Sequence, residues 1–268
     1  MQGPHVLAGN RCSSCPSRLH GPCKGVQQSV LQSIAGVSST ASYAPGATII
    51  AQGESVHHLG IVRHGTVKIS NTTADGRHMV IGLIEDGRLI GNAFEKTSRF
   101  AYESATVSSI CLIPRAAFIK LTQQCTDFSC AVLETAQRQA EEIQEWLTLF
   151  NCRTTLQRLA GYLFALSARR QGAGPASEPL ALEIPVSRKD LAAYLGTTTE
   201  TLSRNMQQLA RKQILTVVDG QKVIITDRKR LNTMAASIGE ELQSLRHGHL
   251  AAAGRPLAGN PAAPLHAA

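Results

Sequence analysis

The stretch that decides the fold is Arg188-Lys-Asp-Leu-Ala-Ala-Tyr-Leu-Gly-Thr-Thr-Thr-Glu-Thr-Leu-Ser-Arg-Asn-Met206. Its spacing predicts two short helices joined by a tight turn. Ala192 stands where two crossing helices leave room only for a small side chain, and Gly196 follows four residues later at the turn. Leu202, six residues further on, packs the second helix back onto the first. The three positions together predict a helix-turn-helix.

The exposed face predicted for the second helix carries side chains suited to DNA. Glu200, Ser203 and Arg204 lie at i, i+3 and i+4, so they share one side of the helix. In a major groove, Arg can bridge two acceptors on guanine, Glu can accept from the amino group of cytosine, and Ser adapts to either. Thr198 or Thr199 can cap this helix. The predicted DNA-contacting residues are Arg188, Lys189, Thr198, Thr199, Glu200, Ser203 and Arg204.

The residues that follow predict a β-hairpin next to the two helices. Leu215-Thr-Val-Val-Asp-Gly-Gln-Lys-Val-Ile-Ile-Thr226 is two β-branched runs about an Asp-Gly turn, which is typical of the wing of a winged helix. Residues 187–230 hold nine Lys or Arg against four Asp or Glu, an excess of five within a chain of net charge +8. An ordinary helical hairpin with a solvated polar face would account for neither the wing nor this charge, so double-stranded DNA is the predicted partner.

An antiparallel β-unit is predicted upstream, from about Tyr43 to Arg115. Short apolar runs alternate there with glycines at a spacing of roughly ten residues. The pairs Asp75-Gly76 and Asp86-Gly87 separate strand-like segments, which is the pattern of hairpin turns.

A long helix is predicted between the two units, from about Phe128 to Phe150. Its apolar residues recur three or four positions apart and form one narrow stripe. Such a stripe can pack on its own domain, or it can form the seam of a two-stranded dimer, which we favour because both neighbouring units already have faces to bury. The predicted dimer-interface residues are Val132, Ala136, Ala140, Ile143, Leu147 and Phe150.

These segments predict an α+β chain of five parts: a cysteine-containing arm (1–26), a β-roll sensor domain (27–122), a dimerisation helix (123–150), a winged helix-turn-helix domain (151–236), and a helix remnant with a tail rich in Ala, Pro and Gly (237–268). With 268 residues, of which 43% are hydrophobic, the chain can build two modest cores.

Several classes of protein are disfavoured by what the sequence lacks. No apolar run approaches the length that crosses a bilayer and no signal peptide is visible, so we expect a cytoplasmic protein with no membrane partner. No Gly-rich phosphate loop, nucleophile elbow or recognisable pair of catalytic carboxylates is present. Cys12-x-x-Cys15 lacks the βαβ context of a redox enzyme. We therefore expect that the chain is not an enzyme.

The motif Glu200-x-x-Ser203-Arg204, preceded by a glycine-punctuated β-roll and a long helix, resembles the Crp/Fnr family of bacterial transcription regulators. The resemblance covers the chain from Cys12 to about Ala236. It implies a homodimer whose recognition helices enter successive major grooves of an inverted repeat. In the FNR branch of the family this motif goes with half-sites of the TTGA type, and the family also implies an activator's contact with RNA polymerase.

The sensor is predicted at the cysteines. Cys12-x2-Cys15-x7-Cys23, with Cys111 in Ile110-Cys-Leu-Ile-Pro114, resembles the FNR-type set of three N-terminal thiolates and one distant thiolate. This set implies an oxygen-sensitive 4Fe-4S cluster and control of anaerobic or microaerobic genes. Some FNR-type proteins place five residues, not seven, between the second and third cysteines, and the spacing here resembles that of regulators of microaerobic metabolism and nitrogen fixation.

Other sensors stay open from the sequence. Zinc held by Cys12, Cys15, Cys23 and His20 is one alternative, and redox-active or inert thiols are another. Cyclic-nucleotide binding is disfavoured, since Gly91-Asn92 and Arg99-Phe100 stand where nucleotide-binding relatives have Gly-Glu and an Arg-Ser or Arg-Thr pair. Haem would have to use histidines in predicted strands and turns, which are usually surface or core residues.

Overall fold

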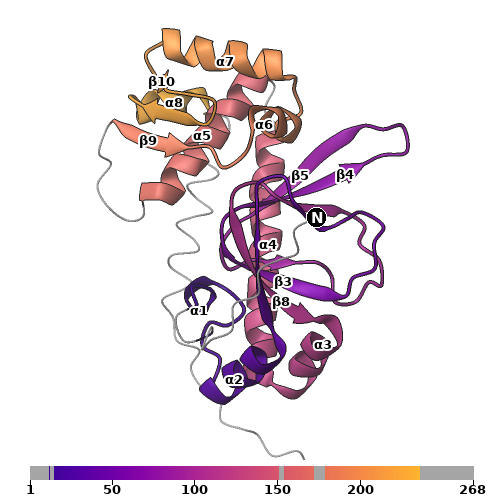
Figure 1. Cartoon of the computed structure of the whole chain (residues 1–268). Helices are drawn as coiled ribbons and strands as arrows, with labels where there is room; N and C mark the ends of the chain where they lie inside the picture. The colour runs from indigo at the N-terminus through magenta and orange to yellow at the C-terminus, as the bar shows by residue number, and fades with distance from the viewer. Residues whose placement is uncertain (1–11, 13–14, 151–153, 172–178, 236–268) are drawn as a thin grey trace, which may run out of the picture.

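The structure is a computed structural model that describes residues 12, 15–150, 154–171 and 179–235. It has the predicted α+β architecture of a β-roll, a long helix and a winged helix-turn-helix (Figure 1). No helix within these ranges is long and apolar enough to cross a lipid bilayer. The predicted tail at 237–268 lies outside the described residues.

The β-roll consists of two four-stranded antiparallel sheets, ordered β1-β8-β3-β6 and β2-β7-β4-β5. Its apolar core lies between them and includes Val62, Val67, Ile90 and Ile110, all fully buried. The strands are β1 (Ser39–Tyr43), β2 (Thr48–Ile50), β3 (His58–His64), β4 (Val67–Thr72), β5 (His78–Ile84), β6 (Leu89–Ile90), β7 (Ala101–Ser104) and β8 (Ser108–Pro114).

Turns at the predicted Asp-Gly pairs connect these strands. Gly76 joins β4 to β5 at a φ of 81°, and Gly87 joins β5 to β6 at a φ of 78°. Both angles lie in the left-handed region that glycine enters without steric cost.

Three short helices flank the β-roll: α1 (Ser17–His20) in the arm, α2 (Gln28–Val37) and α3 (Arg115–Gln124). The sequence analysis predicted none of these three helices. Leu31 and Ile34 of α2 and Phe118 of α3 are buried in one core with Cys23 and Val26 of the arm region. The arm is therefore packed on the β-roll.

Helix α4 (Thr126–Phe150) runs along the β-roll and continues to the DNA-binding domain (Figure 1). Phe128 and Ala131 pack into the core that the arm region, α2 and α3 form against the β-roll, and Trp146 packs against the core of the other domain. One helix therefore contacts both domains.

The C-terminal domain combines four helices with a three-stranded antiparallel sheet ordered β10-β11-β9. Its buried core includes Leu159, Leu163, Leu191, Leu202 and Ile225. The elements are α5 (Thr155–Gln171), β9 (Leu180–Glu183), α6 (Arg188–Tyr194), α7 (Thr199–Arg211), β10 (Leu215–Val217), β11 (Lys222–Ile225) and α8 (Arg228–Met234).

The two domains also touch each other directly. Val80 of β5 is buried in the same core as α6, and Leu83 and Ala105 of the β-roll pack against that core. The orientation of the helix-turn-helix therefore depends on the face of a β-sheet as well as on α4.

Candidate DNA-binding surface and cysteine pocket

Helices α6 and α7 form the helix-turn-helix that the motif predicted. Ala192 is 2% exposed where the helices cross, Leu202 is fully buried, and Gly196 makes the turn at a φ of 61°. The hydroxyl of Thr198 accepts a hydrogen bond from the backbone N–H of Thr201 at 3.2 Å and caps α7. Ser187 caps α6 in the same way through Asp190 at 3.1 Å. Caps of this kind fix where each helix begins.

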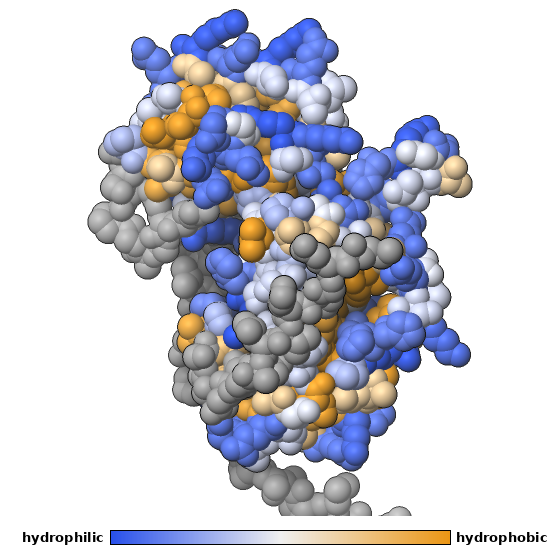
Figure 2. Space-filling model, in the orientation of Figure 1, coloured by the Kyte–Doolittle hydropathy of each residue, from blue (hydrophilic) through white to orange (hydrophobic). Residues whose placement is uncertain are grey.

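The outer face of α7 is exposed, and Figure 2 shows a hydrophilic surface over this end of the molecule. The side chains of Arg204 and Glu200 are 74% and 73% exposed and form an ion pair one turn apart. Ser203 donates to the carbonyl of Thr199 at 2.9 Å. Because exposed ion pairs contribute little free energy, Arg204 and Glu200 can exchange partners at small cost.

The other predicted DNA-contacting residues lie in different surroundings. Arg188 is half-buried and donates to the carbonyl of Asp219 at 3.3 Å, and its burial lowers its pKa from the ordinary value. This contact joins α6 to the wing turn. Lys189 and Thr199 are exposed, whereas the Thr198 hydroxyl serves the cap. Arg188 and Thr198 therefore each make a contact within the domain, whereas Lys189 and Thr199 are exposed to solvent.

Two exposed residues of α7 were missed by the sequence analysis. Gln207 and Arg211 follow Ser203 and Arg204 at helical spacing and extend the same exposed face. The 3–4 spacing that identified Glu200, Ser203 and Arg204 would have found both if it had been followed to the end of the helix.

The wing consists of β10 and β11, whose register pairs Leu215 with Ile225 and Val217 with Val223. The Asp219 carboxylate accepts from the backbone N–H groups of Gln221 and Lys222, both at 2.7 Å, and these bonds lower the pKa of Asp219. The turn is therefore held by an Asp side chain as well as by the Asp-Gly sequence.

All four predicted ligand cysteines line one pocket, which we call the cysteine pocket. Cys12, Cys15 and Cys23 come from the arm. Cys111 comes from the middle of β8, where it pairs with Thr40 of β1 and Ile61 of β3. Leu31 and Ile34 of α2 and Ile61 form its apolar wall. Residues nearly ninety positions apart in the chain thus share one surface.

Two thiols of this pocket, Cys23 and Cys111, resist ionisation. Burial, together with the nearby Cys111, Cys15 and Cys12, raises the pKa of Cys23 to about 12. Burial likewise raises the pKa of Cys111 to about 11, although a hydrogen bond with Ser38 opposes this. A positive ion is what would stabilise thiolates here, because metal ligation displaces the thiol proton.

The donor set is of a kind that an iron–sulfur cluster can use. Four soft thiol donors and an apolar wall are the environment such a cluster takes in proteins. Among the described residues, no three Cys, His, Asp or Glu side chains are grouped closely enough to hold one metal ion. The alternative zinc set is not brought together, because His20 is exposed and does not line the pocket.

The predicted dimer stripe differs from expectation at its beginning. Val132 is half-buried against the β-roll core, because that side of α4 faces its own domain. Leu133 takes its place on the outer face. Phe150 ends α4, but its side chain lies outside the described part of the chain. The exposed stripe is Leu133, Ala136, Ala140, Ile143 and Leu147.

Asn92 and Arg99, which stand where nucleotide-binding relatives contact the ligand, are engaged with other groups of the protein. Arg99 is 74% exposed and pairs with Glu95 at 2.7 Å. The Asn92 side chain accepts from the backbone N–H of Phe94 at 2.9 Å.

Comparisons with known proteins agree with this architecture. Residues 157–234 match the family described as the Crp-like helix-turn-helix domain, and residues 40–125 match the cyclic nucleotide-binding domain. The chain is 28% identical over 231 residues to the transcriptional activator protein FnrL of Cereibacter sphaeroides, which covers 85% of this chain and 92% of the relative. It is 23% identical over 229 residues to the nitrogen fixation regulation protein FixK of Bradyrhizobium diazoefficiens, which covers 85% and 95%.

Among solved structures, FixK2 from Bradyrhizobium japonicum superposes with a TM-score of 0.65 at 24% identity, over 75% of this chain and 98% of that chain. The fold and the helix-turn-helix define a DNA-binding transcription regulator, and not an enzyme. The chain belongs to the Crp/Fnr family.

Proposed function

We propose that this regulator responds to oxygen through a 4Fe-4S cluster held by Cys12, Cys15, Cys23 and Cys111. As a homodimer it binds an inverted repeat of TTGA-type half-sites and, with RNA polymerase, controls genes for anaerobic or microaerobic life. Its relatives include proteins named FnrL, FnrA and anr, which are described as transcriptional activators.

The observation that carries this proposal is the meeting of four cysteines at one pocket. Three belong to the arm, and the fourth lies in β8 at the centre of a sheet. Thiols are usually retained for their reactivity or for metal binding more than for their packing. A shared ligand explains why these residues converge.

Zinc and a cluster make different demands on the spacing of the thiols. Thiolates that bind one zinc ion lie about 3.8 Å from each other, since each Zn–S bond is about 2.3 Å in a tetrahedral site. A cubane places four irons and four sulfides between its ligands and so holds them farther apart. We favour the cluster because all four cysteines line one pocket, whereas His20 of the alternative zinc set does not line it.

The chain's own residues would then link the arm to the β-roll. Ligation by Cys111 together with the three arm cysteines fixes the arm against β8, while Leu31 and Ile34 shield the pocket from water. A bound 4Fe-4S cluster supplies a redox- and oxygen-sensitive group whose persistence depends on these four thiolates. Loss of the ligation frees the arm.

The exposed stripe on α4 supports dimerisation. Its members are spaced three, four, three and four residues apart, which is the heptad pattern of a two-stranded coiled coil. Ile143 and Leu147 are 54% and 58% exposed, and Leu133 is 66% exposed. A second copy of α4 would bury all three.

The proposal is tested by comparing Cys111→Ser with Cys130→Ser after purification without air. Cys130 is exposed on α4 and does not line the pocket, so it is the matched control. Wild type and Cys130→Ser should contain about four iron and four sulfide per chain and lose their visible absorbance in air. Cys111→Ser should lose iron and anaerobic operator binding.

Zinc in place of iron in the wild type would support the structural-zinc alternative instead. Full iron content in Cys111→Ser would remove Cys111 from the ligand set and contradict the proposal.

A further inference from the structure

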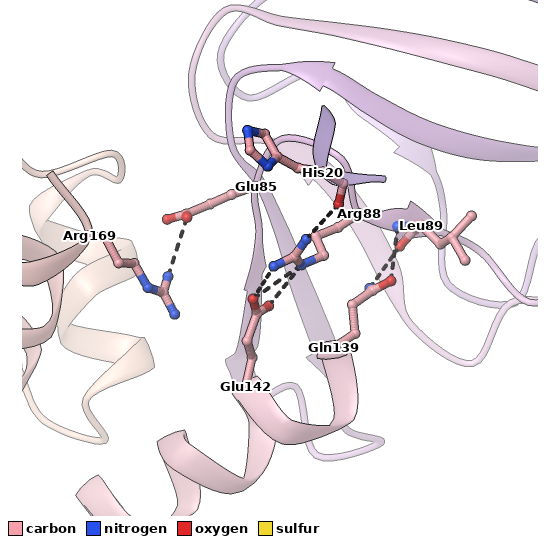
Figure 3. A network of polar contacts seen from close by, with 7 residues as sticks. All are labelled: His20, Glu85, Arg88, Leu89, Gln139, Glu142 and Arg169. Carbon is pink, nitrogen blue, oxygen red and sulfur yellow. Dashed lines mark hydrogen bonds and ion pairs between the residues drawn. The ribbon is translucent and has the colours of Figure 1, made fainter. Parts of the chain in front are cut away.

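Arg88 lies between the cysteine arm and the long helix, at the end of the turn that joins β5 to β6 (Figure 3). Its Nε donates to both carboxylate oxygens of Glu142 in α4 at 3.2 Å, and its Nη2 also pairs with Glu142. Its Nη1 donates to the backbone carbonyl of His20 in the arm at 3.4 Å. One guanidinium therefore holds two segments that are far apart in the chain.

The arm meets this turn through two glycines. A Cβ added at Gly21 would lie 2.7 Å from the carbonyl oxygen of Gly87, and a Cβ added at Gly87 would lie 2.9 Å from the carbonyl carbon of His20. Backbone therefore packs on backbone, two residues before Cys23. Because neither side can give way, the position of the arm is tied to the position of the turn.

The same turn is bonded to α4 a second time. Gln139 accepts from the backbone N–H of Leu89 at 3.0 Å and donates to the Leu89 carbonyl at 3.1 Å. Residues 87–89 thus contact the arm on one side and one turn of α4 on the other (Figure 3). A further link between the arm and α4, Lys24 to Glu134, is exposed and 3.9 Å long, so it contributes little.

The turn of α4 that Arg88 contacts lies next to the exposed stripe and to the DNA-binding domain. Glu142 adjoins Ile143 of the exposed stripe. Trp146, one turn later, packs on Tyr194 of α6 and Tyr162 of α5 at centroid distances of 4.5 and 5.6 Å. A shift at Glu142 therefore reaches the stripe and the DNA-binding domain together.

We propose that Arg88 is the positioning residue that transmits docking of the cysteine arm to α4. This inference rests on the proposed function, in which ligation by the four cysteines docks the arm. Arg88 is only 16% exposed with the arm in place, and Glu142 is 31% exposed. When the arm leaves, Arg88 loses the His20 carbonyl and gains water, and the screened ion pair with Glu142 holds α4 less firmly.

The test uses Arg88→Gln and Gly21→Ala, singly and together, in the full chain prepared without air. Arg99→Gln is the matched control for the first, since Arg99 also forms an ion pair with a glutamate, Glu95, but this pair involves neither the arm nor α4. Gly36→Ala is the control for the second, because a Cβ there meets nothing within 4 Å.

The first measurement is the ratio of operator affinities before and after air, on a duplex with two TTGA-type half-sites. Arg88→Gln should keep the iron content of the wild type while this ratio falls about tenfold, a common size for coupling between sites. Arg99→Gln should keep the ratio. A ratio equal to that of the wild type in Arg88→Gln would overturn the inference while leaving the proposed function intact.

The second measurement is hydrogen exchange of residues 139–145, which needs no iron. Each single variant should speed this exchange, and the double variant should speed it no more than the larger single change, because both break one connection. Multiplicative effects would show two independent contacts and overturn the inference. Iron-free wild-type protein would defeat the proposed function, and the exchange data would still decide the role of Arg88.

Discussion

The side chains that we predict to face DNA already contact each other or their own helix in the free protein. Glu200 and Arg204 pair across one turn of α7, and Ser203 bonds to the Thr199 carbonyl. Such pairing orients the two charged groups before a base arrives, and their exposure keeps the cost of separating them small. Specificity at this surface therefore depends on new bonds to bases more than on breaking old ones.

Replacement of Arg204 by Ala should weaken binding to a matched operator by about 1–3 kcal/mol, because a bidentate contact to guanine is lost. Binding to random DNA should change little. The measurement is a pair of titrations on matched and scrambled duplexes at the same salt concentration. An equal loss on both duplexes would instead assign Arg204 to a phosphate.

At the scale of the element, α4 has two faces with different tasks. Phe128, Ala131 and Trp146 attach it to the two domains of its own chain. The opposite face presents Ile143 and Leu147 to solvent. An apolar stripe at heptad spacing on an otherwise anchored helix favours pairing with a second copy.

Ile143→Glu should raise the dissociation constant of the dimer by roughly 100-fold, since a carboxylate would be buried in the seam at a cost of about 3 kcal/mol. Ile143→Leu keeps the apolar volume and should leave the dimer unchanged. Sedimentation velocity of anaerobically prepared protein measures both. A glutamate variant that dimerises like the wild type would place the interface elsewhere.

At the scale of the whole molecule, a buried lysine joins the sensor sheet to the DNA-binding domain. Lys68 of β4 lies 2.9 Å from both Glu103 of β7 and Asp190 of α6, with only 11% of its side chain exposed. Burial by itself would lower the pKa of Lys68, but hydrogen bonds and attraction from the two carboxylates outweigh it and raise the pKa above 10.5. Together with Val80, this contact holds α6 against the β-roll.

Lys68→Met should lower the free energy of unfolding by about 3 kcal/mol at neutral pH, because two carboxylates lose their shared cation. The Lys68 pKa is raised in the folded state, so its contribution is complete below pH 10.5 and falls as the pH rises through the higher folded value. Urea unfolding at several pH values measures this. The difference from the wild type should shrink above pH 10.5, and a constant difference would contradict the assignment.

The sequence by itself determined the features that depend on local spacing. Ala192, Gly196 and Leu202 predicted the helix-turn-helix, and the Asp-Gly pairs predicted the turns of the β-roll. Period and turn chemistry act over a few residues, so they can be recognised without knowing what packs against them.

Only the tertiary structure decided the features that depend on which surfaces meet. The pairing of β8 with β3 carries Cys111 to the arm cysteines, and the β-roll core takes Val132 and leaves Leu133 exposed. Helices α2 and α3 form because the core covers their short apolar faces. The ion pairs Arg88–Glu142 and Lys68–Asp190 join segments more than fifty positions apart, and long-range contacts of this kind have no signal in the spacing of residues along the chain.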